Sequence, residues 1–160
     1  MVVIITIMIL ISQPSPEDVH ILQHLNHEVF LDNQKYDDDL VMGWALSKAG
    51  ERYFSRLLSG KGNVCFIAYD GQIPVGYIAC SPKKVSYRKS RYLEIDNMGV
   101  VPAYRSKGIG TKLVSRVKQW AKQHHYQKLF VNSYFHNSKA IAFYRRNGFA
   151  EIDLGLEMGV

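Results

Sequence analysis

The sequence predicts an α+β fold, in which helices pack on one central mixed β-sheet. Segments with strand and helix patterns follow one another in the order β, α, α, β, β, β, α, β, α, β. The turn Asp70-Gly71-Gln72 separates two apolar runs and is typical of a β-hairpin. The chain has 160 residues, of which 47% are hydrophobic, and it has no linker or repeat, so we expect a single domain over residues 1–160.

The first expected strand is the N-terminal run Met1–Ile11, which is rich in Val, Ile and Thr and predicts a buried strand. This run has no basic residue, is too short to span a bilayer and leads into the stretch Ser12–Pro16. The core of a signal peptide is the alternative for the same run.

Two helices are expected next. Glu17 and Asp18 form the acidic first turn of one helix. Its apolar residues recur at helical spacing and are Val19, Leu22, Leu25 and Val29. A second helix is expected over Met42–Leu58, after the polar stretch Asp32–Asp39, and a glycine-containing segment ends it.

The sheet then continues through the middle of the chain. Strands are expected over Val64–Tyr69, Ile73–Cys80 and Tyr92–Val101, and the basic loop Ser81–Ser90 joins the last two. Cys65 and Cys80 lack the spacing of a metal or redox motif. We interpret both as buried thiols of a protein from a reducing cytoplasm.

Helix and strand alternate in the last third of the chain. One helix face carries Ile109, Leu113, Val117 and Trp120. A strand over Lys128–Tyr134 follows. Asn137 or Ser138 can then cap a helix that runs to Arg146, and Phe149–Met158 is expected as the closing strand.

Positive charge is concentrated in one stretch of the chain. The formal net charge is +6, and 12 of the 20 basic residues fall between Lys83 and Lys128, where Glu94 and Asp96 are the only acidic residues. Such a patch suits a polyanion, for example a nucleic acid, an anionic membrane surface or a phosphorylated cofactor. A solvated basic face is the alternative interpretation. The stretch contains no recognisable nucleic-acid recognition motif.

The segment Val100–Gly110 is a strand end that passes through a basic turn with two glycines into a helix. Such a turn directs free backbone N–H groups at an anion, and the helix dipole adds to the attraction. Gly108 and Gly110 allow close approach of a phosphate, while Arg105 and Lys107 add charge. The spacing fits neither the dinucleotide fingerprint nor the Walker loop, so the turn indicates a pyrophosphate site of another kind.

A second motif begins about thirty residues later. On a helix, Asn137, Ile141, Tyr144 and Gly148 are spaced by three or four residues and share one face, so an amide and a phenol point in the same direction. Taken alone, a tyrosine near a helix end is usually a core residue with its hydroxyl at the rim.

Together the two motifs resemble the GNAT superfamily of acyl-CoA-dependent N-acetyltransferases. The first reads Arg105-x-x-Gly108-x-Gly110 and the second reads Asn137-x-x-Ala140-x-x-Phe143-Tyr144-x-x-x-Gly148-Phe149. The resemblance implies a mostly antiparallel central sheet whose two parallel strands splay at the cofactor cleft, with helices on both faces. It implies acetyl-CoA as co-substrate and an amine as acceptor, without a metal.

The resemblance also assigns residues to the cofactor. The pyrophosphate loop corresponds to Arg105, Ser106, Lys107, Gly108, Ile109, Gly110 and Thr111. The strand that pairs with pantetheine corresponds to 97–101, with Met98, Gly99 and Val100 as binding residues and an expected bulge at Met98-Gly99. Asn137 would touch the pantetheine arm and Tyr144 would lie beside the thioester sulfur. Ser106 departs from the family pattern, where glycine is common.

The implied reaction is direct attack by a neutral amine on the thioester. An amine with a pKa of about 10.4 is mostly protonated at neutral pH, so a base must take its proton. Glu94 and Asp96 are the candidates because residues two apart on a strand face the same way. The alternative is that one or both pair with Arg88, with Arg91 or with a neighbouring strand.

Charge stabilisation and proton return complete the expected chemistry. A backbone N–H near Val100 would hold the oxyanion, and Tyr144 would protonate the thiolate. Cys65 and Cys80 lack a partnering histidine in a recognisable arrangement, so a covalent enzyme intermediate is not expected.

The acceptor is the least determined part of the reaction. Asp37, Asp38 and Asp39 lie where the family builds part of its acceptor pocket and would attract a cationic small-molecule or protein amine, although a solvated loop explains them too. His20, His24 and His27 form a solvated stripe rather than a metal site. We expect no nucleic acid and no membrane as partner, and a homodimer is compatible with the sequence. A catalytically silent acyl-CoA sensor and a basic nucleic-acid-binding module remain the alternative functions.

Overall fold

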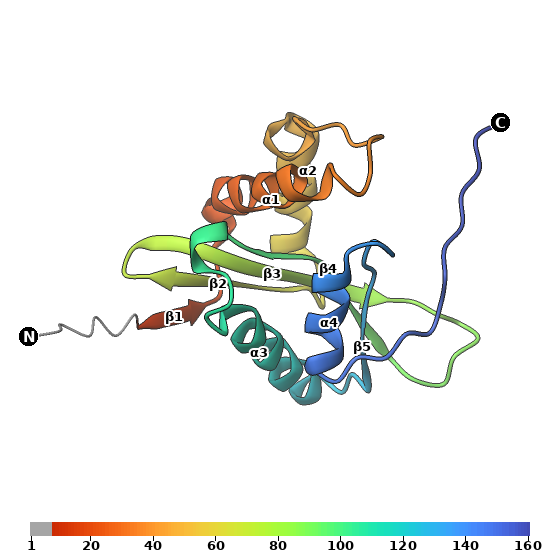
Figure 1. Cartoon of the computed structure of the whole chain (residues 1–160). Coiled ribbons are helices and arrows are strands. Elements are labelled where there is room, and N and C mark those ends of the chain that lie inside the picture. Colours follow the sequence, from red (N-terminus) through yellow and green to blue (C-terminus); the bar gives the residue numbers. More distant parts are fainter. Residues whose placement is uncertain (1–7) are drawn as a thin grey trace, which may run out of the picture.

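A computed structural model describes residues 8–160 and places a five-stranded sheet between two layers of helices (Figure 1). The strands lie in the order β1-β2-β3-β4-β5. Their bounds are β1 Ile9–Ser12, β2 Val64–Asp70, β3 Ile73–Lys83, β4 Tyr92–Val100 and β5 Lys128–Val131. The helices are α1 Val19–Asn33, α2 Lys48–Ser59, α3 Ile109–Gln123 and α4 Ser138–Arg146. Short 3₁₀ turns cover Pro16–Asp18, Trp44–Leu46 and Pro102–Tyr104.

The sheet is mixed, as the sequence predicts. Neighbouring strands from β1 to β4 are antiparallel, whereas β4 and β5 are parallel. The parallel pair needs a crossover connection, which α3 supplies. The α+β class is therefore confirmed.

Helices cover both faces of the sheet (Figure 1). Leu22 of α1 and Phe54 of α2 are fully buried against one face, together with Ile67 and Tyr77 of the sheet. On the other face α3 packs Leu113 and Val117 against β2, β3 and β4, and Phe143 of α4 joins this second cluster. Cys65 and Cys80 are free, buried thiols, as expected.

The first strand is shorter and more exposed than predicted. Residues 1–7 of the expected run lie outside the described residues. β1 pairs with β2 at the edge of the sheet, and Ile9 and Ile11 pack on the core while Leu10 points outward and is 62% exposed. Only one neighbour strand is available at an edge, which explains why this strand is half-buried rather than buried.

The second helix begins six residues later than predicted. The side chain of Ser47 accepts hydrogen bonds from the N–H groups of Ala49 and Gly50, so it caps the helix and α2 begins at Lys48. The preceding residues turn as a 3₁₀ segment at Trp44–Leu46. A backbone carbonyl lies 2.3 Å from where a Cβ of Gly50 would stand, so glycine permits this tight entry.

The predicted closing strand Phe149–Met158 is wrong. After α4 the chain has no regular secondary structure, and residues 150–160 are exposed. Figure 1 shows this tail running past the end of the sheet to the C-terminus. The apolar alternation of the segment is that of a strand, but a strand forms only where a neighbouring strand satisfies its backbone groups, and none lies beside the tail in residues 8–160.

A bulge in β4 lies at Asp96, not at Met98-Gly99 as expected. Asn97 pairs with Ala79 and Ile95 pairs with Cys80, so Asp96 stands between them as an extra residue. An extra residue reverses the alternation of side chains beyond it. Ile95 therefore packs toward α3, and Asn97, two residues on, points toward α1 and α2 instead.

The parallel strands separate at the same point. β5 pairs with β4 only from Tyr92 to Ile95, and its own last paired residue is Val131. From Asn97 to Val100, β4 is bonded to β3 on one side, and in the described chain no strand covers its other edge. This split in the sheet is the splay that the family resemblance implies.

Candidate active site

A cavity of about 590 Å³ lies at the split between β4 and β5. Four of the residues singled out from the sequence line it, namely Asp96, Met98, Asn137 and Tyr144. Residues of α1, α2 and the segment after β5 complete its walls. Glu94, Gly99, Val100 and the loop 105–111 are not among its lining residues.

Asp96 lines this cavity, and one of its carboxylate oxygens has no partner in the described chain. Its Oδ1 accepts a hydrogen bond of 3.0 Å from the hydroxyl of Ser81, while the buried Oδ2 has no hydrogen-bond partner among the described residues. Burial, and to a smaller degree the charge of Glu94, raises the pKa of this carboxyl. A carboxylate with a raised pKa and a free oxygen can accept a proton from a ligand.

Glu94 is engaged differently. Its carboxylate lies 3.1 Å from the ammonium of Lys83, on the neighbouring strand β3, and both side chains are partly exposed. The partner is thus Lys83 on the neighbouring strand, one of the expected alternatives, and not Arg88 or Arg91. The two acidic side chains have different partners but lie on the same face of β4, as expected, because the charges of both raise the pKa of Tyr53 on α2.

Tyr144 and Asn137 reach the cavity from α4. Burial raises the pKa of Tyr144 to about 12, so its phenol is protonated at neutral pH. Phe143 and Phe149 hold its ring edge-on at centroid distances of 5.2 and 5.5 Å. Asn137 caps α4, since its Oδ1 accepts a hydrogen bond of 3.1 Å from the Ala140 N–H, and its side-chain amide lines the cavity.

The glycine-bearing loop before α3 presents backbone donors. Gly108 caps α3 with a φ of +78°, and Ser106 also has a positive φ of +59°. The Lys112 N–H makes the first bond of the helix, to the Gly108 carbonyl. In the described chain the N–H groups of residues 106–111 have no acceptor, so they are available to an anion.

The second glycine of the motif has a packing role as well. A Cβ at Gly110 would stand 3.0 Å from the ring of Phe143, so this glycine lets α3 and α4 approach each other. Gly99 acts in the same way on the other face, where a Cβ would lie 2.4 Å from the side chain of Val29 on α1.

Arg105 links three elements around the loop. Its guanidinium contacts the carboxylate of Asp32 at the end of α1, and its Nε donates a hydrogen bond of 2.7 Å to the Val100 carbonyl. Lys107 lies over the ring of Tyr104, with its ammonium 5.0 Å from the centroid. Arg105 therefore already has an anionic partner, while the ammonium of Lys107 projects from an exposed turn.

An aromatic wall at the cavity was missed from the sequence. Phe30 of α1 stacks on Trp44 at a centroid distance of 5.8 Å, and Trp44 meets Tyr53 of α2 edge-on at 5.3 Å. All three line the cavity. The only sequence signal was the helical spacing of Tyr53 with Leu57, which marks a buried face but not what that face contacts.

A buried polar network supports this wall. Asn97 donates a hydrogen bond of 2.8 Å to the Tyr53 hydroxyl. Asn26 of α1 donates to the oxygen of Asn97 at 2.9 Å and to the hydroxyl of Tyr77 at 2.8 Å. Burial raises the pKa of Tyr53 to about 12, and the charge of Asp96 adds to the effect. The network ties α1, α2, β3 and β4 into one rigid side of the cavity.

Of the three aspartates 37–39, Asp37 is the one whose side chain bonds to a residue of the cavity wall. Asp37 accepts a hydrogen bond of 2.7 Å from the hydroxyl of Tyr134, a residue that lines the cavity. This bond and burial raise the pKa of Tyr134 to about 12, with burial the larger cause. Asp38 and Asp39 are exposed.

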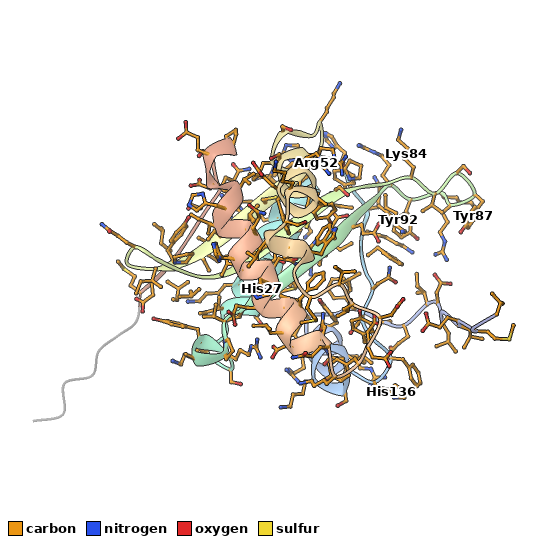
Figure 2. All side chains as sticks on the ribbon, turned by 90° about the horizontal axis from the view of Figure 1, so that it is seen from above. His27, Arg52, Lys84, Tyr87, Tyr92 and His136 are labelled. Atoms are coloured by element: carbon orange, nitrogen blue, oxygen red, sulfur yellow. The ribbon has the colours of Figure 1, made fainter. Side chains whose placement is uncertain are left out.

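Other sequence signals lie apart from the cavity. His20 and His24 are exposed on α1, and His27 is half-buried on the same helix (Figure 2). Within residues 8–160 no group of histidine, cysteine and carboxylate side chains could hold a metal ion. Over the same range no helix has the length and hydropathy needed to cross a membrane.

The sequence matches one protein family over most of its length. The model of the Acetyltransferase (GNAT) family matches residues 19–149. An uncharacterised N-acetyltransferase of Methanocaldococcus jannaschii is 32% identical over 100 residues, which are 62% of this chain and 44% of that protein. The uncharacterised N-acetyltransferase YhfO of Bacillus subtilis is 29% identical over 104 residues, which are 65% of this chain and 70% of that protein. The match thus spans less than half of the archaeal relative.

A solved structure shows the same fold. The aminoglycoside acetyltransferase AAC(6')-Iy, in complex with the bisubstrate analogue CoA-S-monomethyl-acetylneamine, superposes with a TM-score of 0.73 over 96% of this chain and 98% of that chain. The two sequences are 15% identical, so the likeness concerns the fold alone.

Proposed function

Because this chain belongs to the acetyltransferase (GNAT) family, we propose that it transfers an acetyl group from acetyl-CoA to a primary amine. One observation carries the proposal. Asp96, which has one carboxylate oxygen without a partner in the described chain, and Tyr144, a protonated phenol, line the same cavity at the split of β4 and β5. An acceptor that must lose a proton and a leaving group that must gain one require such a pair.

Residues around the split fit acetyl-CoA. The N–H groups of residues 106–111 would bind its pyrophosphate, with Lys107 adding positive charge. The uncovered edge of β4, with Met98, Gly99 and Val100, would pair with the amides of the pantetheine arm as a strand does. Asn137 would hold the same arm from the other side. Bound acetyl-CoA supplies an activated thioester, so direct attack by a neutral amine suffices.

Asp96 is the first candidate for the base. Asp96 lines the cavity and has one oxygen without a partner among the described residues, whereas Glu94 is paired with Lys83 and lies outside the cavity. Asp96 would take the proton of the amine, either directly or through one water molecule. Glu94 would act on the reaction through its charge, which favours the protonated form of Asp96.

Tyr144 would hold the departing sulfur. A phenol with a pKa of about 12 is fully protonated and can donate a hydrogen bond. As the thioester breaks, the phenol would donate its hydrogen bond to the sulfur and pass its proton to the leaving thiolate.

The walls of the cavity suit a cationic acceptor. A positively charged amine is attracted to the faces of aromatic rings and to carboxylates, and Phe30, Trp44 and Tyr53 stand beside Asp96. The neighbour of similar fold acts on aminoglycosides by its name, and these carry several amines. We infer a small polycationic amine as the acceptor class, while a lysine side chain of a protein is the second candidate.

Release of free thiol from acetyl-CoA in the presence of a panel of amines tests the function. The panel should contain an aminoglycoside, a polyamine and a lysine-containing peptide. We expect release that depends on the amine and that stops when the amine is omitted. Tight binding of acetyl-CoA without release for any amine would instead favour the acyl-CoA sensor.

A further inference from the structure

The hydroxyl of Tyr53 carries a proton that the proposed reaction does not use. Tyr53 lies on α2, is half-buried, and lines the cavity at the split of β4 and β5, which we call the acceptor cavity. Its oxygen accepts a hydrogen bond of 2.8 Å from the Nδ2 of Asn97. Within residues 8–160 the hydroxyl itself donates to no acceptor. Burial is the main cause that raises the pKa of Tyr53 to about 12, so the proton is present at neutral pH.

The direction of the bond between Asn97 and Tyr53 is set by the residues behind it. Asn97 Oδ1 accepts from Asn26 Nδ2 at 2.9 Å and from the Tyr77 hydroxyl at 3.1 Å, which uses both of its lone pairs. Asn26 Nδ2 also donates to the Tyr77 oxygen at 2.8 Å, so both of its amide hydrogens are used. Turning the Asn97 amide over would place its NH₂ group against the NH₂ group of Asn26. Asn97 therefore presents its NH₂ group to Tyr53, and the phenol oxygen is the acceptor.

Burial holds this direction in place. Tyr77 is fully buried and Asn26 is 3% exposed. Buried polar groups keep their hydrogen-bond partners, because water is not at hand to replace them. Asn26 comes from α1, whereas Tyr77 and Asn97 come from β3 and β4, so packing of the helix on the sheet fixes the chain of bonds. The phenol of Tyr53 is therefore left as a donor.

Two other side chains of the acceptor cavity differ from Tyr53 in what they can bind. The hydroxyl of Tyr134 already donates to Asp37 at 2.7 Å, so its proton is used within the protein. Asp96 is an acceptor, which suits the N–H groups of an amine. A phenol whose oxygen is occupied by Asn97 needs a lone pair on its partner. An ammonium group has no lone pair, so it cannot accept this bond.

We propose that Tyr53 donates its proton to a hydroxyl oxygen of the acceptor, and thereby selects amines that carry a hydroxyl close to the amine over polyamines without oxygen. This inference rests on the proposed function and narrows its acceptor class. A plain polyamine would fill the cavity and leave the Tyr53 donor unpaired, whereas a hydroxylated amine satisfies it. Asn97 is then a positioning residue, because it acts on the acceptor only through the direction that it gives to Tyr53.

Binding of matched diamines tests the selection without any need for turnover. Diaminopropane and diaminopropanol differ by one hydroxyl, as do diaminobutane and diaminobutanol. Isothermal titration calorimetry should show that the wild-type protein binds the hydroxylated member of at least one pair roughly tenfold more tightly. Tyr53→Phe should bind both members of that pair alike. Because the hydroxyl also lowers the pKa of the neighbouring amines, the change of this ratio between variants is the quantity that counts.

Tyr134→Phe is the matched control. It removes a hydroxyl from the wall of the same cavity, but one whose proton already belongs to Asp37, so the preference for the hydroxylated diamine should persist. Circular dichroism should show both phenylalanine variants folded. A wild-type protein without a preference in either pair, or a Tyr53→Phe variant that keeps the wild-type preference, would overturn the proposal.

Asn97→Asp tests the direction of the bond. A carboxylate at this position still accepts from Asn26 and Tyr77, as the Asn97 Oδ1 does, but it takes the proton of Tyr53 instead of donating to the phenol. The preference should therefore fall as in Tyr53→Phe, although the phenol itself remains. A purely structural role of Asn97 would change the affinity for both members of a pair equally and leave their ratio unchanged, and this result would contradict the positioning role.

Thiol release from acetyl-CoA with the same diamines separates this inference from the proposed function. Release with both members of each pair, at a ratio that Tyr53→Phe does not change, would contradict the selection and leave the transferase intact. A preference in binding that Tyr53→Phe removes, without release for any amine, would contradict the transferase and leave the selection by Tyr53 intact.

Discussion

Ionisation of Asp96 lowers the stability of the folded protein. Burial raises the pKa of its carboxyl, so the folded protein binds the proton more tightly than the unfolded chain does. Stability therefore falls as pH rises from the ordinary value of about 3.9 through the raised value. At neutral pH the folded protein carries a charge that the unfolded chain would hold more easily. The ionised form of Asp96, which could act as a base, is therefore held in the folded protein at a cost in stability.

Replacing Asp96 by asparagine should separate stability from activity. Asp96→Asn keeps the size and an acceptor for Ser81 but cannot ionise. We expect a higher Tm at pH 7 and a gain that disappears near pH 3, where the wild-type carboxyl is protonated in both states. Activity should fall, and less so at high pH, because solution then supplies more neutral amine. Thermal melts and pH–rate profiles measure the two effects.

Glu94→Gln is the control for that experiment. It removes the ion pair with Lys83 without touching the cavity, so it should not raise the Tm at pH 7 and should shift the acidic limb of the pH–rate profile only slightly. Equal pH profiles for wild type and Asp96→Asn would mean that the amine loses its proton elsewhere. Asp96 would then be a structural partner of Ser81 only.

Tyr144→Phe should remove the donor and leave the packing. The ring between Phe143 and Phe149 stays, so the fold and the affinity for acetyl-CoA should be preserved. Loss of a positioned proton donor typically lowers kcat by about 10² to 10⁴. Steady-state kinetics with acetyl-CoA show the change. Full activity in this variant would assign Tyr144 to packing alone and leave the thiolate to water.

Among the secondary-structure elements, the turn before α3 and the bulge in β4 do most to form the site. The turn depends on Gly108, whose φ of +78° is unfavourable for any residue with a Cβ. The bulge depends on a single extra residue, Asp96, which directs Asn97 toward Tyr53. Without it, the amide would face α3 and the polar network would not form.

Gly108→Val should abolish the stabilisation of the protein by acetyl-CoA. A ligand at a hundredfold excess over its Kd adds about 2.7 kcal/mol to the free energy of unfolding. For a protein of this size that corresponds to a Tm increase of roughly 5–10 °C. We expect this increase for the wild type and none for Gly108→Val. Differential scanning fluorimetry with and without acetyl-CoA measures it.

Gly71→Val provides the matched strain control. Gly71 has a positive φ of +59° and, like Gly108, has no neighbouring atom within 4 Å of where a Cβ would stand, but it lies in the hairpin between β2 and β3. Both substitutions should lower the Tm of the free protein by similar amounts. Only Gly71→Val should retain the increase with acetyl-CoA. A wild-type Tm that does not change with saturating acetyl-CoA would contradict the cofactor assignment itself.

Some of these structural features can be predicted from the sequence, whereas others cannot. Local signals suffice for the hairpin at Gly71, for the turn at Gly108 and for the cap at Asn137, because each depends on residues adjacent in the chain. The bulge at Asp96 depends on how β4 registers with β3, which no local pattern records. The network of Asn26, Tyr77, Asn97 and Tyr53 joins residues up to 71 positions apart, so only the folded chain brings it together.

The molecule as a whole separates its charges. The basic stretch of the sequence includes the loop that would bind acetyl-CoA, while Asp37, Asp38 and Asp39 lie beyond Tyr134 on the acceptor side. An anionic substrate and a cationic one would thus each be attracted to a different end of the split. The predicted closing strand does not form, because residues 152–158 have the pattern of a strand but the described chain holds no neighbouring strand for them.

Neutralising Asp38 and Asp39 together should affect only the amine. Both are exposed, whereas Asp37 holds Tyr134 and is left intact. We expect a higher KM for a cationic amine and an unchanged KM for acetyl-CoA. Raising the salt from 0.1 to 1 M shortens the screening length from about 10 to about 3 Å, so it should raise both KM values in the wild type. An unchanged amine KM in the variant would mean that these aspartates are merely solvated.

The aromatic wall also makes the acceptor cavity visible to spectroscopy. The chain has two tryptophans: Trp44 stands in this wall, and Trp120 stacks on His124 along α3 at a centroid distance of 3.8 Å. In a Trp120→Phe variant, all indole emission would come from the acceptor cavity. Quenching of that emission would then register the arrival of an amine even when no acetyl group is transferred, so acceptors and non-reactive competitors can be ranked by titration before any turnover is measured.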